Sequence, residues 1–567
     1  MWADDDRDTL SKAQLRKLDY FASELRVGGG RMLDVGCGWG ALLDRFTRHH
    51  GARAGLGLTL SPAQAAHVND RTGPDVSIRL EHWADHEPTA LYDAITCIEA
   101  TEHFASDGLE PDAKVDVYRS FFERCATWLR PAGRVGLQLI CLDNVGHAGS
   151  RPGRGPLSEL IRTVIFPESM PASLSELVLG WETHFRLVSF LDHTAHYVRT
   201  FRAWSLAERA DRVTARGLIG TPMARAFEQY FAVGEAIFRL REQALYRVVL
   251  EKRPEPKTWA VSVRPSDVHD GHVAVVSGAS TTALRSHYDV SNDFYRLWLG
   301  STMMYSSGRW PVGADGLSLD VAQDAKIDAV ASWTDVRPEG RVLDVGCGWG
   351  YAARRLVTEH AGGRAVGLTP SRAQYEYMAV HAHRGVEPRL ERWEEHTPMA
   401  PYDVIVSFGA FEHFAPDGSR GPQRIAAYRV FFARCYEWLV PGGRLCLESI
   451  AHDDAPDTDV PRGRGPLGDA VLSLYPESLC PHLSEIVLGF EPWFELEVLE
   501  SAAADFARTT NLWARNLRRR QLEAHALVGA ETTKRFWQYL VASDIQFRLN
   551  AVTNYRLVLR RRAAPRW

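Results

Sequence analysis

A long internal repeat is the feature that most restricts how this chain can fold. Residues 31–40 read RMLDVGCGWG, and residues 341–350 read RVLDVGCGWG, 310 positions later. FFERC at 121–125 and FFARC at 431–435 repeat with the same offset. A repeat of this length is a whole domain rather than one module of a solenoid, so the 567 residues predict two related domains in tandem.

The repeats predict a first domain at 1–253, a linker at 254–284 and a second domain at 285–567. The linker is rich in proline, glycine, serine and valine, which is typical of an ordered connection or a short hairpin. We expect that the two copies can pack on each other in the manner of a dimer.

The first copy is shortened at its start. Only 35 residues precede Gly36, whereas its counterpart Gly346 follows His287 by 59 positions. The first copy therefore lacks SHYDVSNDFYRLWLGSTMMYSS at the corresponding place. We expect it to be a truncated and more degenerate domain than the second copy.

Composition excludes several classes of protein. Hydrophobic residues make up 45% and charged residues 24%, the net charge is −5, and the eight cysteines include no CxxC pair. With no apolar run of about 18 residues, we expect no spanning helix, no disulfide framework, no metal site and no attraction to nucleic acid. The acidic start lacks the apolar stretch of a secretory signal, so a cytoplasmic location is expected.

Within each copy, short apolar runs alternate with amphipathic stretches. In the second copy RVLDVG, RAVGLT, YDVIVSF and RLCLESI are expected strands, and helices are expected between them. This alternation predicts an α/β fold with a mostly parallel sheet, whose ligands bind beyond the carboxyl ends of the strands. The glycine loop at 346–350 follows a strand and opens a helix, which favours a nucleotide-like cofactor; without a GK[ST] ending it is not a phosphate loop of a triphosphatase.

Further motifs in the second copy make this interpretation specific. DVGCGWG, GLTPSRAQ at 367–374, WEEH at 393–396 and GAFEHF at 409–414 resemble the S-adenosylmethionine-dependent methyltransferases of the cyclopropane-fatty-acid synthase and mycolic acid cyclopropane synthase family. HYDVSNDFYRLWLGSTMMYSS at 287–307 is similar to that family's N-terminal lid. The resemblance implies two Rossmann-like class I methyltransferase domains, each with a helical substrate cap, and S-adenosyl-L-methionine as cofactor.

The resemblance also implies which residues contact the cofactor. In the second copy these are Tyr305, Ser306, Asp344, Gly346, Gly348, Thr369, Gln374, Trp393 and Glu394. A possible second site in the first copy consists of Gly36, Gly38, Thr59, Gln64 and Trp83. The first copy has Ala84 where the second has Glu394, and it lacks the Tyr-Ser pair of the lid, so weaker binding or none is expected there.

In the family that the motifs resemble, an alkene attacks the sulfonium methyl group and a base then removes a proton from the resulting carbocation. Such a site needs an apolar channel, electron-rich walls and one base. The family's base is a bicarbonate ion, and its contacts correspond here to Ser307, Glu412, Glu448, Ile450 and Tyr539. Ser307 replaces a cysteine and Glu448 a histidine of the family pattern.

The carboxylate of Glu448 makes bicarbonate a doubtful ligand. Two like charges at about 4 Å repel by roughly 4 kcal/mol at an effective dielectric constant near 20. We therefore hypothesise that Glu448, or Glu412 and Glu448 together, accepts the proton. The alternative is that Glu448 faces a lysine or an arginine and takes no part in the chemistry.

Other functions remain open at this stage. The substrate could be a lipid, an isoprenoid or a carrier-bound polyketide, and the product a ring or a methyl branch. The first copy could be a binding or scaffold module, or the linker could complete a second active site in it. Basic clusters at 515–521 and 559–566 are more typical of a solvated helix face than of a nucleic-acid site, and they could also contact anionic headgroups or an acyl carrier.

Overall fold

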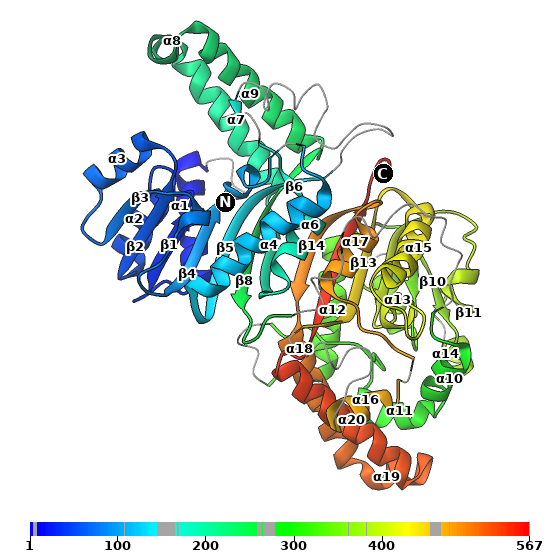
Figure 1. Ribbon diagram of the computed structural model, residues 1–567. Coiled ribbons are helices and arrows are strands. Elements are labelled where there is room, and N and C mark those ends of the chain that lie inside the picture. The colour runs from blue at the N-terminus through cyan, green and yellow to red at the C-terminus, as the bar shows by residue number, and fades with distance from the viewer. Residues whose placement is uncertain are drawn as a thin grey trace. The chain divides into compact units, whose positions relative to one another are not determined.

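The computed structural model consists of two compact units, one within residues 1–266 and one within 267–565. It describes residues 1–3, 8–106, 108–143, 165–166, 169–257, 264, 278–311, 313, 316–360, 362–381, 383–453, 466–475 and 477–565 (Figure 1). The boundary lies inside the predicted linker, of which residues 258–263 and 265–277 are outside the described part. The predicted start of the second domain at 285 falls inside helix α10 (Thr281–Tyr288).

Each unit contains a sheet in which one described strand, the second from the end of the orders given next, runs antiparallel to the others. In unit 1 the order is β3-β2-β1-β4-β5-β8-β7, and in unit 2 it is β11-β10-β9-β12-β13-β15-β14. The first five strands in each of these orders pair in parallel. The sixth strand, β8 or β15, runs antiparallel to both of its neighbours. The parallel part has its carboxyl ends along one edge, and there the glycine loops lie.

The strands of unit 1 are β1 (Arg31–Val35), β2 (Ala54–Thr59), β3 (Val76–Leu80), β4 (Tyr92–Ile98), β5 (Leu129–Leu142), β6 (Ala172–Ser173), β7 (Phe185–Asp192) and β8 (Gln243–Lys252). Those of unit 2 are β9 (Arg341–Val345), β10 (Arg364–Thr369), β11 (Val386–Leu390), β12 (Tyr402–Phe408), β13 (Leu439–His452), β14 (Phe494–Ser501) and β15 (Val552–Arg561).

The helices of unit 1 are α1 (Leu10–Glu24), α2 (Ala41–His50), α3 (Pro62–Arg71), η1 (Trp83–Asp85), η2 (Thr101–His103), α4 (Pro111–Trp128), α6 (Leu174–Trp181), α7 (Thr194–Ala210), α8 (Arg212–Ile219) and α9 (Thr221–Arg239). After α10, those of unit 2 are α11 (Asn292–Leu299), α12 (Leu319–Thr334), α13 (Tyr351–Thr358), α14 (Arg372–His381), η6 (Trp393–Glu395), η7 (Phe411–His413), α15 (Pro422–Trp438), α16 (Pro466–Leu472), α17 (Leu483–Phe490), α18 (Ala503–Arg519), α19 (Gln521–Val528) and α20 (Ala530–Arg548).

The predicted α/β fold and its duplication are confirmed. Strands that are covered on both faces should be apolar along their length, and the central residues Leu343 of β9 and Ile405 of β12 are fully buried. The expected strands RVLDVG, RAVGLT, YDVIVSF and RLCLESI correspond to β9, β10, β12 and β13.

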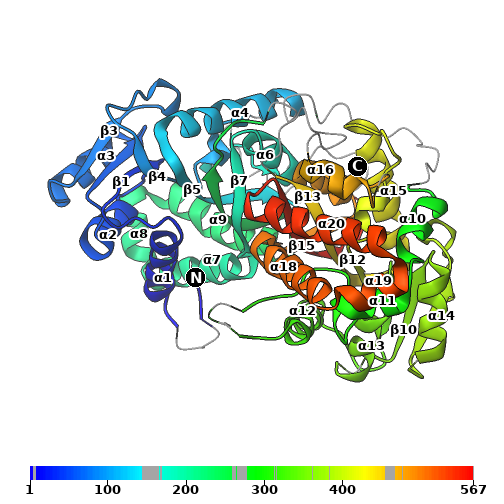
Figure 2. The same ribbon diagram turned by 90° about the horizontal axis from the view of Figure 1, so that it is seen from below.

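A helical cap, formed by α18, α19 and α20, stands at one end of unit 2. Helix α11 packs against α18 and α19, as both views show (Figures 1 and 2). The carbonyl of Trp298 in α11 accepts a hydrogen bond from Asn516 of α18 at 3.2 Å. In unit 1 the helices α7, α8 and α9 occupy the corresponding positions in sequence, but its described residues contain no counterpart of α10 or α11.

Within the described residues, no helix combines the length and hydropathy needed to cross a membrane. The same part of the chain contains no cluster of three or more His, Cys, Asp or Glu side chains suited to a metal ion.

Candidate active site in the second unit

The glycine loop of unit 2 connects β9 to α13 through left-handed backbone. Gly346 has φ +75° and Gly348 φ +56°, values that side chains rarely allow. A Cβ atom on Gly346 would lie 2.5 Å from the Cβ of Ala410, so a larger residue cannot fit without displacing the neighbouring loop. The local sequence therefore keeps an open surface where β9 ends.

This surface borders a cavity of about 120 Å³. The cavity is lined by all nine residues that the resemblance assigned to the cofactor: Tyr305, Ser306, Asp344, Gly346, Gly348, Thr369, Gln374, Trp393 and Glu394. They come from the ends of β9 and β10, the loop after β9, α14, η6, and the segment between α11 and α12. The structure thus brings together motifs that are up to 89 positions apart in the sequence.

Asp344 is the acidic group at the floor of the cavity. It is 2% exposed, its Oδ2 atom has no hydrogen-bond partner, and burial raises the pKa of its carboxyl group to about 7. Beside it, the Thr369 hydroxyl donates to Gln374 Oε1 at 2.7 Å, and Arg392 holds the Glu394 carboxylate at 2.7 Å. These contacts hold the Gln374 and Glu394 side chains in place along the lining of the cavity.

Sequence reasoning missed several residues that line the same cavity. Leu284 and Tyr288 belong to α10, Met303 and Met304 precede the predicted lid pair, and His413 follows Glu412. Tyr288, Met303 and Met304 lie inside the lid motif at 287–307. They could have been predicted if the whole motif, and not only its last residues, had been assigned to the cavity. The Tyr288 hydroxyl lies 3.3 Å from His413 Nε2, which links α10 to η7.

Glu412 is a second buried carboxyl group, next in sequence to His413, which lines the cavity. Its Oε1 accepts the backbone N–H of Ile450 at 2.5 Å, whereas Oε2 is buried without a hydrogen-bond partner. Burial raises the pKa of Glu412 to about 7, and the charge of Glu448 acts in the same direction. Tyr539 of α20 is also buried, and its pKa is raised by burial, so its phenol remains a donor.

An aromatic cluster joins α10 and α11 to α20 of the helical cap. Its members are His287, Tyr295, Tyr305, Tyr475, Phe536 and Tyr539. The ring of His287 is 4.1 Å from that of Tyr475 and 5.8 Å from that of Tyr305, centroid to centroid. Burial lowers the pKa of His287 well below its usual value, so this wall is uncharged and rich in π-electrons.

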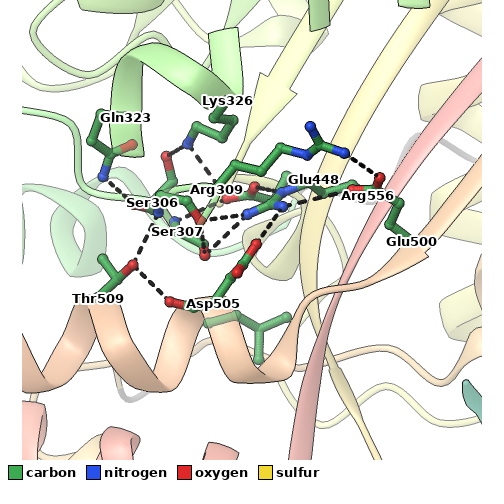
Figure 3. A network of polar contacts seen from close by, with 12 residues as sticks. Ser306, Ser307, Arg309, Gln323, Lys326, Glu448, Glu500, Asp505, Thr509 and Arg556 are labelled. Atoms are coloured by element: carbon green, nitrogen blue, oxygen red, sulfur yellow. Dashed lines mark hydrogen bonds and ion pairs between the residues drawn. The ribbon is translucent and has the colours of Figure 1, made fainter. Parts of the chain in front are cut away.

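The structure places Glu448 away from free space, beside two cations. Its side chain is 2% exposed, Arg556 Nε lies 2.8 Å from Oε2, and Lys326 Nζ lies 3.7 Å from Oε1 (Figure 3). The backbone N–H of Ser307 donates to the same Oε1 at 3.1 Å. The sequence left two possibilities for Glu448: a role as proton acceptor, or a position facing a lysine or an arginine. In the structure Glu448 faces both kinds of basic side chain. Ser307 and Glu448 therefore form one cluster, and Glu412 and Ile450 another.

Unit 1 keeps the local geometry of the glycine loop but differs around it. Gly36 has φ +75°, and Thr59 donates to Gln64 at 2.7 Å, as in unit 2. Where unit 2 has Gly409, unit 1 has Glu99 in left-handed conformation, with φ +54°. The Glu99 carboxylate accepts a hydrogen bond from Tyr197 at 2.7 Å.

Comparisons with known proteins agree with the geometry. A family model described as mycolic acid cyclopropane synthetase matches residues 1–248 and 277–557. Cyclopropane mycolic acid synthase 2 of Mycobacterium tuberculosis is 32% identical over 278 residues, which cover 47% of this chain and 90% of that protein. Cyclopropane mycolic acid synthase MmaA2 of the same species is 31% identical over 288 residues, covering 47% and 93%. Its solved structure aligns with a TM-score of 0.44 and 28% identity, covering 50% of this chain and 99% of that one.

Asp344 predicts that cofactor affinity depends on pH. An ionised carboxylate accepts hydrogen bonds and attracts an ammonium group. Because the pKa of Asp344 is about 7, its carboxyl group is mostly protonated below that pH, and we expect cofactor binding to require its loss of the proton. Lowering the pH from 8 to 6 should weaken binding of S-adenosylhomocysteine about tenfold in isothermal titration. Asp344→Asn should bind weakly with no such dependence, and a flat profile for the unmodified protein would contradict this role.

Proposed function

The chain belongs to the mycolic acid cyclopropane synthetase family and is an S-adenosylmethionine-dependent methyltransferase, and on this premise we propose that unit 2 transfers a one-carbon group to a carbon–carbon double bond of an apolar, lipid-like substrate. The observation that carries the proposal is the position of Glu412. This buried carboxyl group has an oxygen without a hydrogen-bond partner, its neighbours in sequence Ala410 and His413 line the cavity for the cofactor, and its charge acts on Tyr539 of the aromatic cluster.

The residues of the cavity fit S-adenosylmethionine. Asp344 offers an unpartnered acceptor oxygen, the loop at Gly346 leaves space that a Cβ atom would fill, and Trp393 supplies an aromatic surface. When bound, the cofactor supplies an electrophilic methyl group. The 305–306 pair covers the cavity and limits the access of water to it.

Glu412 is then the proposed proton acceptor. It belongs to η7, directly after Gly409 and Ala410, which line the cavity. One oxygen is fixed by the Ile450 N–H, so the carboxyl group is oriented while the other oxygen stays available. A pKa of about 7 suits a group that accepts a proton near neutral pH. The role needs no bicarbonate ion.

The aromatic cluster is the proposed wall for the substrate. Electron-rich rings stabilise positive charge by cation–π interaction, by about 0.5–2 kcal/mol for each well-placed ring. The neutral His287 and the protonated phenols of Tyr295 and Tyr539 add no charge of their own. An alkene carbon that becomes cationic on methyl transfer would be stabilised there until Glu412 removes the proton.

Replacing Glu412 by Gln should abolish turnover and preserve cofactor binding. We expect kcat to fall by about 10²–10⁴-fold, because general bases contribute that much, with the affinity for S-adenosylhomocysteine unchanged. In the unmodified enzyme kcat should rise with pH through about 7, since Glu412 must be ionised to accept a proton. The measurement is methyl transfer to an unsaturated acyl lipid, followed by NMR of the product to separate a ring from a methyl branch.

The matched control is Glu102→Gln in unit 1. Glu102 occupies the position of Glu412, accepts the Ile140 N–H at 2.6 Å, and has a pKa raised by burial to about 8. If unit 2 performs the reaction, this variant keeps full activity. Loss of activity only in the unit 1 variant would show that the wrong unit has been assigned.

We further propose that unit 1 performs no transfer. Its described residues have no lid pair, Ala84 replaces Glu394, and Glu99 replaces Gly409. Unit 1 contains a cavity of about 120 Å³ next to Glu102 and Tyr230. It is lined mainly by apolar and aromatic side chains, among them Phe201 and Phe238. Unit 1 would thus keep a place for an apolar ligand without a complete cofactor site, as a binding or scaffold module.

Titration of the full chain with S-adenosylhomocysteine should therefore give about one site. Gly346→Ala should remove it, because the new Cβ would lie 2.5 Å from Ala410 in a strained backbone. Gly36→Ala introduces the same contact, 2.6 Å from Ala100, and should leave the stoichiometry unchanged. Two sites of similar affinity, one lost in each variant, would refute a single cofactor site.

A lipid surface is the proposed source of the substrate. On the helical cap of unit 2, Leu522 of α19 is 84% exposed and Leu527 is 46% exposed, next to Arg518 and Arg519 at the end of α18. Exposed apolar side chains with adjacent cations are typical of helices that lie on anionic membranes.

Vesicles rich in phosphatidylglycerol should sediment the protein at low salt, because the arginines meet anionic headgroups there. Leu522→Asp should weaken this binding severalfold. The control Val380→Asp changes a residue of α14 that is equally exposed, at 80%, and should have no effect. Binding that is equal in both variants, or absent in the unmodified protein, would favour delivery by a carrier instead.

A further inference from the structure

We propose that Glu448, paired with Arg556, is a positioning residue that holds residues 305–308 closed over the cofactor cavity. These four residues are called the lid segment below. The inference rests on the proposed function, because the lid segment acts through the cofactor that it covers.

Glu448 contacts the lid segment through its backbone. The Ser307 N–H donates to Glu448 Oε1 at 3.1 Å, and the second oxygen of the carboxylate accepts Arg556 Nε at 2.8 Å. Glu448 stands on β13 and Arg556 on β15, where the two are direct partners in the antiparallel register. The pairing of β13 with β15 therefore holds the Glu448 carboxylate beside Arg556, independently of the lid segment.

Arg556 extends this contact along the lid segment. Its Nη2 donates to the Gly308 carbonyl at 2.7 Å and to the Ser307 hydroxyl at 3.1 Å, while Nη1 donates to Asp505 at 2.9 Å. A guanidinium group has five donors in a fixed plane, so one side chain can bind two lid residues and two carboxylates together.

The remaining lid contacts come from α12 and α18, on opposite sides (Figure 3). From α12, Lys326 Nζ donates to the Ser306 hydroxyl at 2.5 Å and Gln323 to the Ser306 carbonyl at 2.8 Å. From α18, Thr509 accepts the Gly308 N–H at 3.0 Å. The lid segment is thus hydrogen-bonded from two helices, at Ser306 by α12 and at Gly308 by α18.

Charge explains why a carboxylate is needed at position 448. Arg556 and Lys326 are almost completely buried, with side chains 2% and 0% exposed. Buried cations are strongly disfavoured unless they are paired and hydrogen-bonded. Glu448 is close to both, so its loss would leave positive charge against the lid segment.

Unit 1 provides an internal comparison. It keeps Lys17, Thr200 and Arg247 at the positions of Lys326, Thr509 and Arg556, but it has Gln138 in place of Glu448. There Gln138 accepts Arg247 Nε at 2.7 Å and donates to Glu99, whose carboxylate replaces the missing charge. The carboxylate at the Glu448 position thus occurs in the unit that has a lid segment, and not in the other.

The test is Glu448→Gln in the full chain. We expect the Kd for S-adenosylhomocysteine to rise about tenfold, with kcat at saturating cofactor lowered by no more than about threefold. Amide hydrogen exchange of a peptide spanning 303–310 should accelerate at least about tenfold, because the Ser307 N–H loses its charged acceptor. Arg556→Lys, which keeps the charge and loses the planar donors, should show the same pattern and serves if the first variant fails to fold.

The control is Glu497→Gln, which breaks another carboxylate–arginine pair of the same sheet, with Arg444 at 2.7 Å, away from the lid segment. It should alter neither Kd nor exchange at 303–310. Loss of kcat with unchanged Kd would identify Glu448 as the base and overturn the inference, and so would a lower melting temperature with unchanged Kd and exchange. Failure of the unmodified chain to bind S-adenosylhomocysteine would instead refute the proposed function.

Discussion

The buried guanidinium group of Arg556 is the constraint around which unit 2 is organised. A cation with a side chain 2% exposed is stable only where carboxylates and carbonyl groups surround it, and breaking one such pair costs about 3–5 kcal/mol. Arg556 gathers its partners from three separate places: Glu448 on β13, Asp505 on α18, and the backbone near Gly308. Satisfying one charge therefore joins the sheet, the helical cap and the cover of the cofactor cavity.

The two copies show how one scaffold reaches electrostatic balance in two ways. In unit 2 the acidic partner of the strand arginine is the direct cross-strand neighbour, Glu448. In unit 1 that neighbour is neutral Gln138, and the carboxylate comes from Glu99 at the end of β4, held in left-handed backbone. Gly409, at the same place in unit 2, has left-handed backbone as well, with φ +66°, and a Cβ atom there would be in ordinary contact with the lid, 3.8 Å from the Tyr305 carbonyl oxygen. The carboxylate therefore lies on the neighbouring strand in the unit that has a lid, and at the end of β4 in the unit whose described residues have none.

Local motifs predicted the fold well, because strand–glycine–helix units place their own residues. All nine assigned residues line one cavity: those from Asp344 onward lie at or after the ends of parallel strands, whereas Tyr305 and Ser306 come from the segment between α11 and α12. The surroundings of Glu448 were not predictable in this way. Its partner Arg556 lies 108 positions later on an antiparallel strand, and no short motif contains both. The sequence also did not reveal that Trp2 of unit 1 corresponds to Trp310 of unit 2. The Trp2 indole donates to Thr200 at 3.0 Å, and the Trp310 indole donates to Thr509 at 3.1 Å. The residues around Trp2 and Trp310 share no extended motif.

The same reasoning separates the roles of the two carboxyl groups that sequence alone left coupled. Glu448 has both oxygens engaged, one by the Ser307 N–H and one by Arg556. Glu412 has one oxygen anchored and one free, and burial without a cation raises its pKa to about 7. The two carboxyl groups, on neighbouring elements, thus differ in their partners: Glu448 lies beside two basic side chains, and Glu412 accepts one backbone N–H. Under the proposed function, this difference separates a group that holds the lid segment from one that accepts a proton.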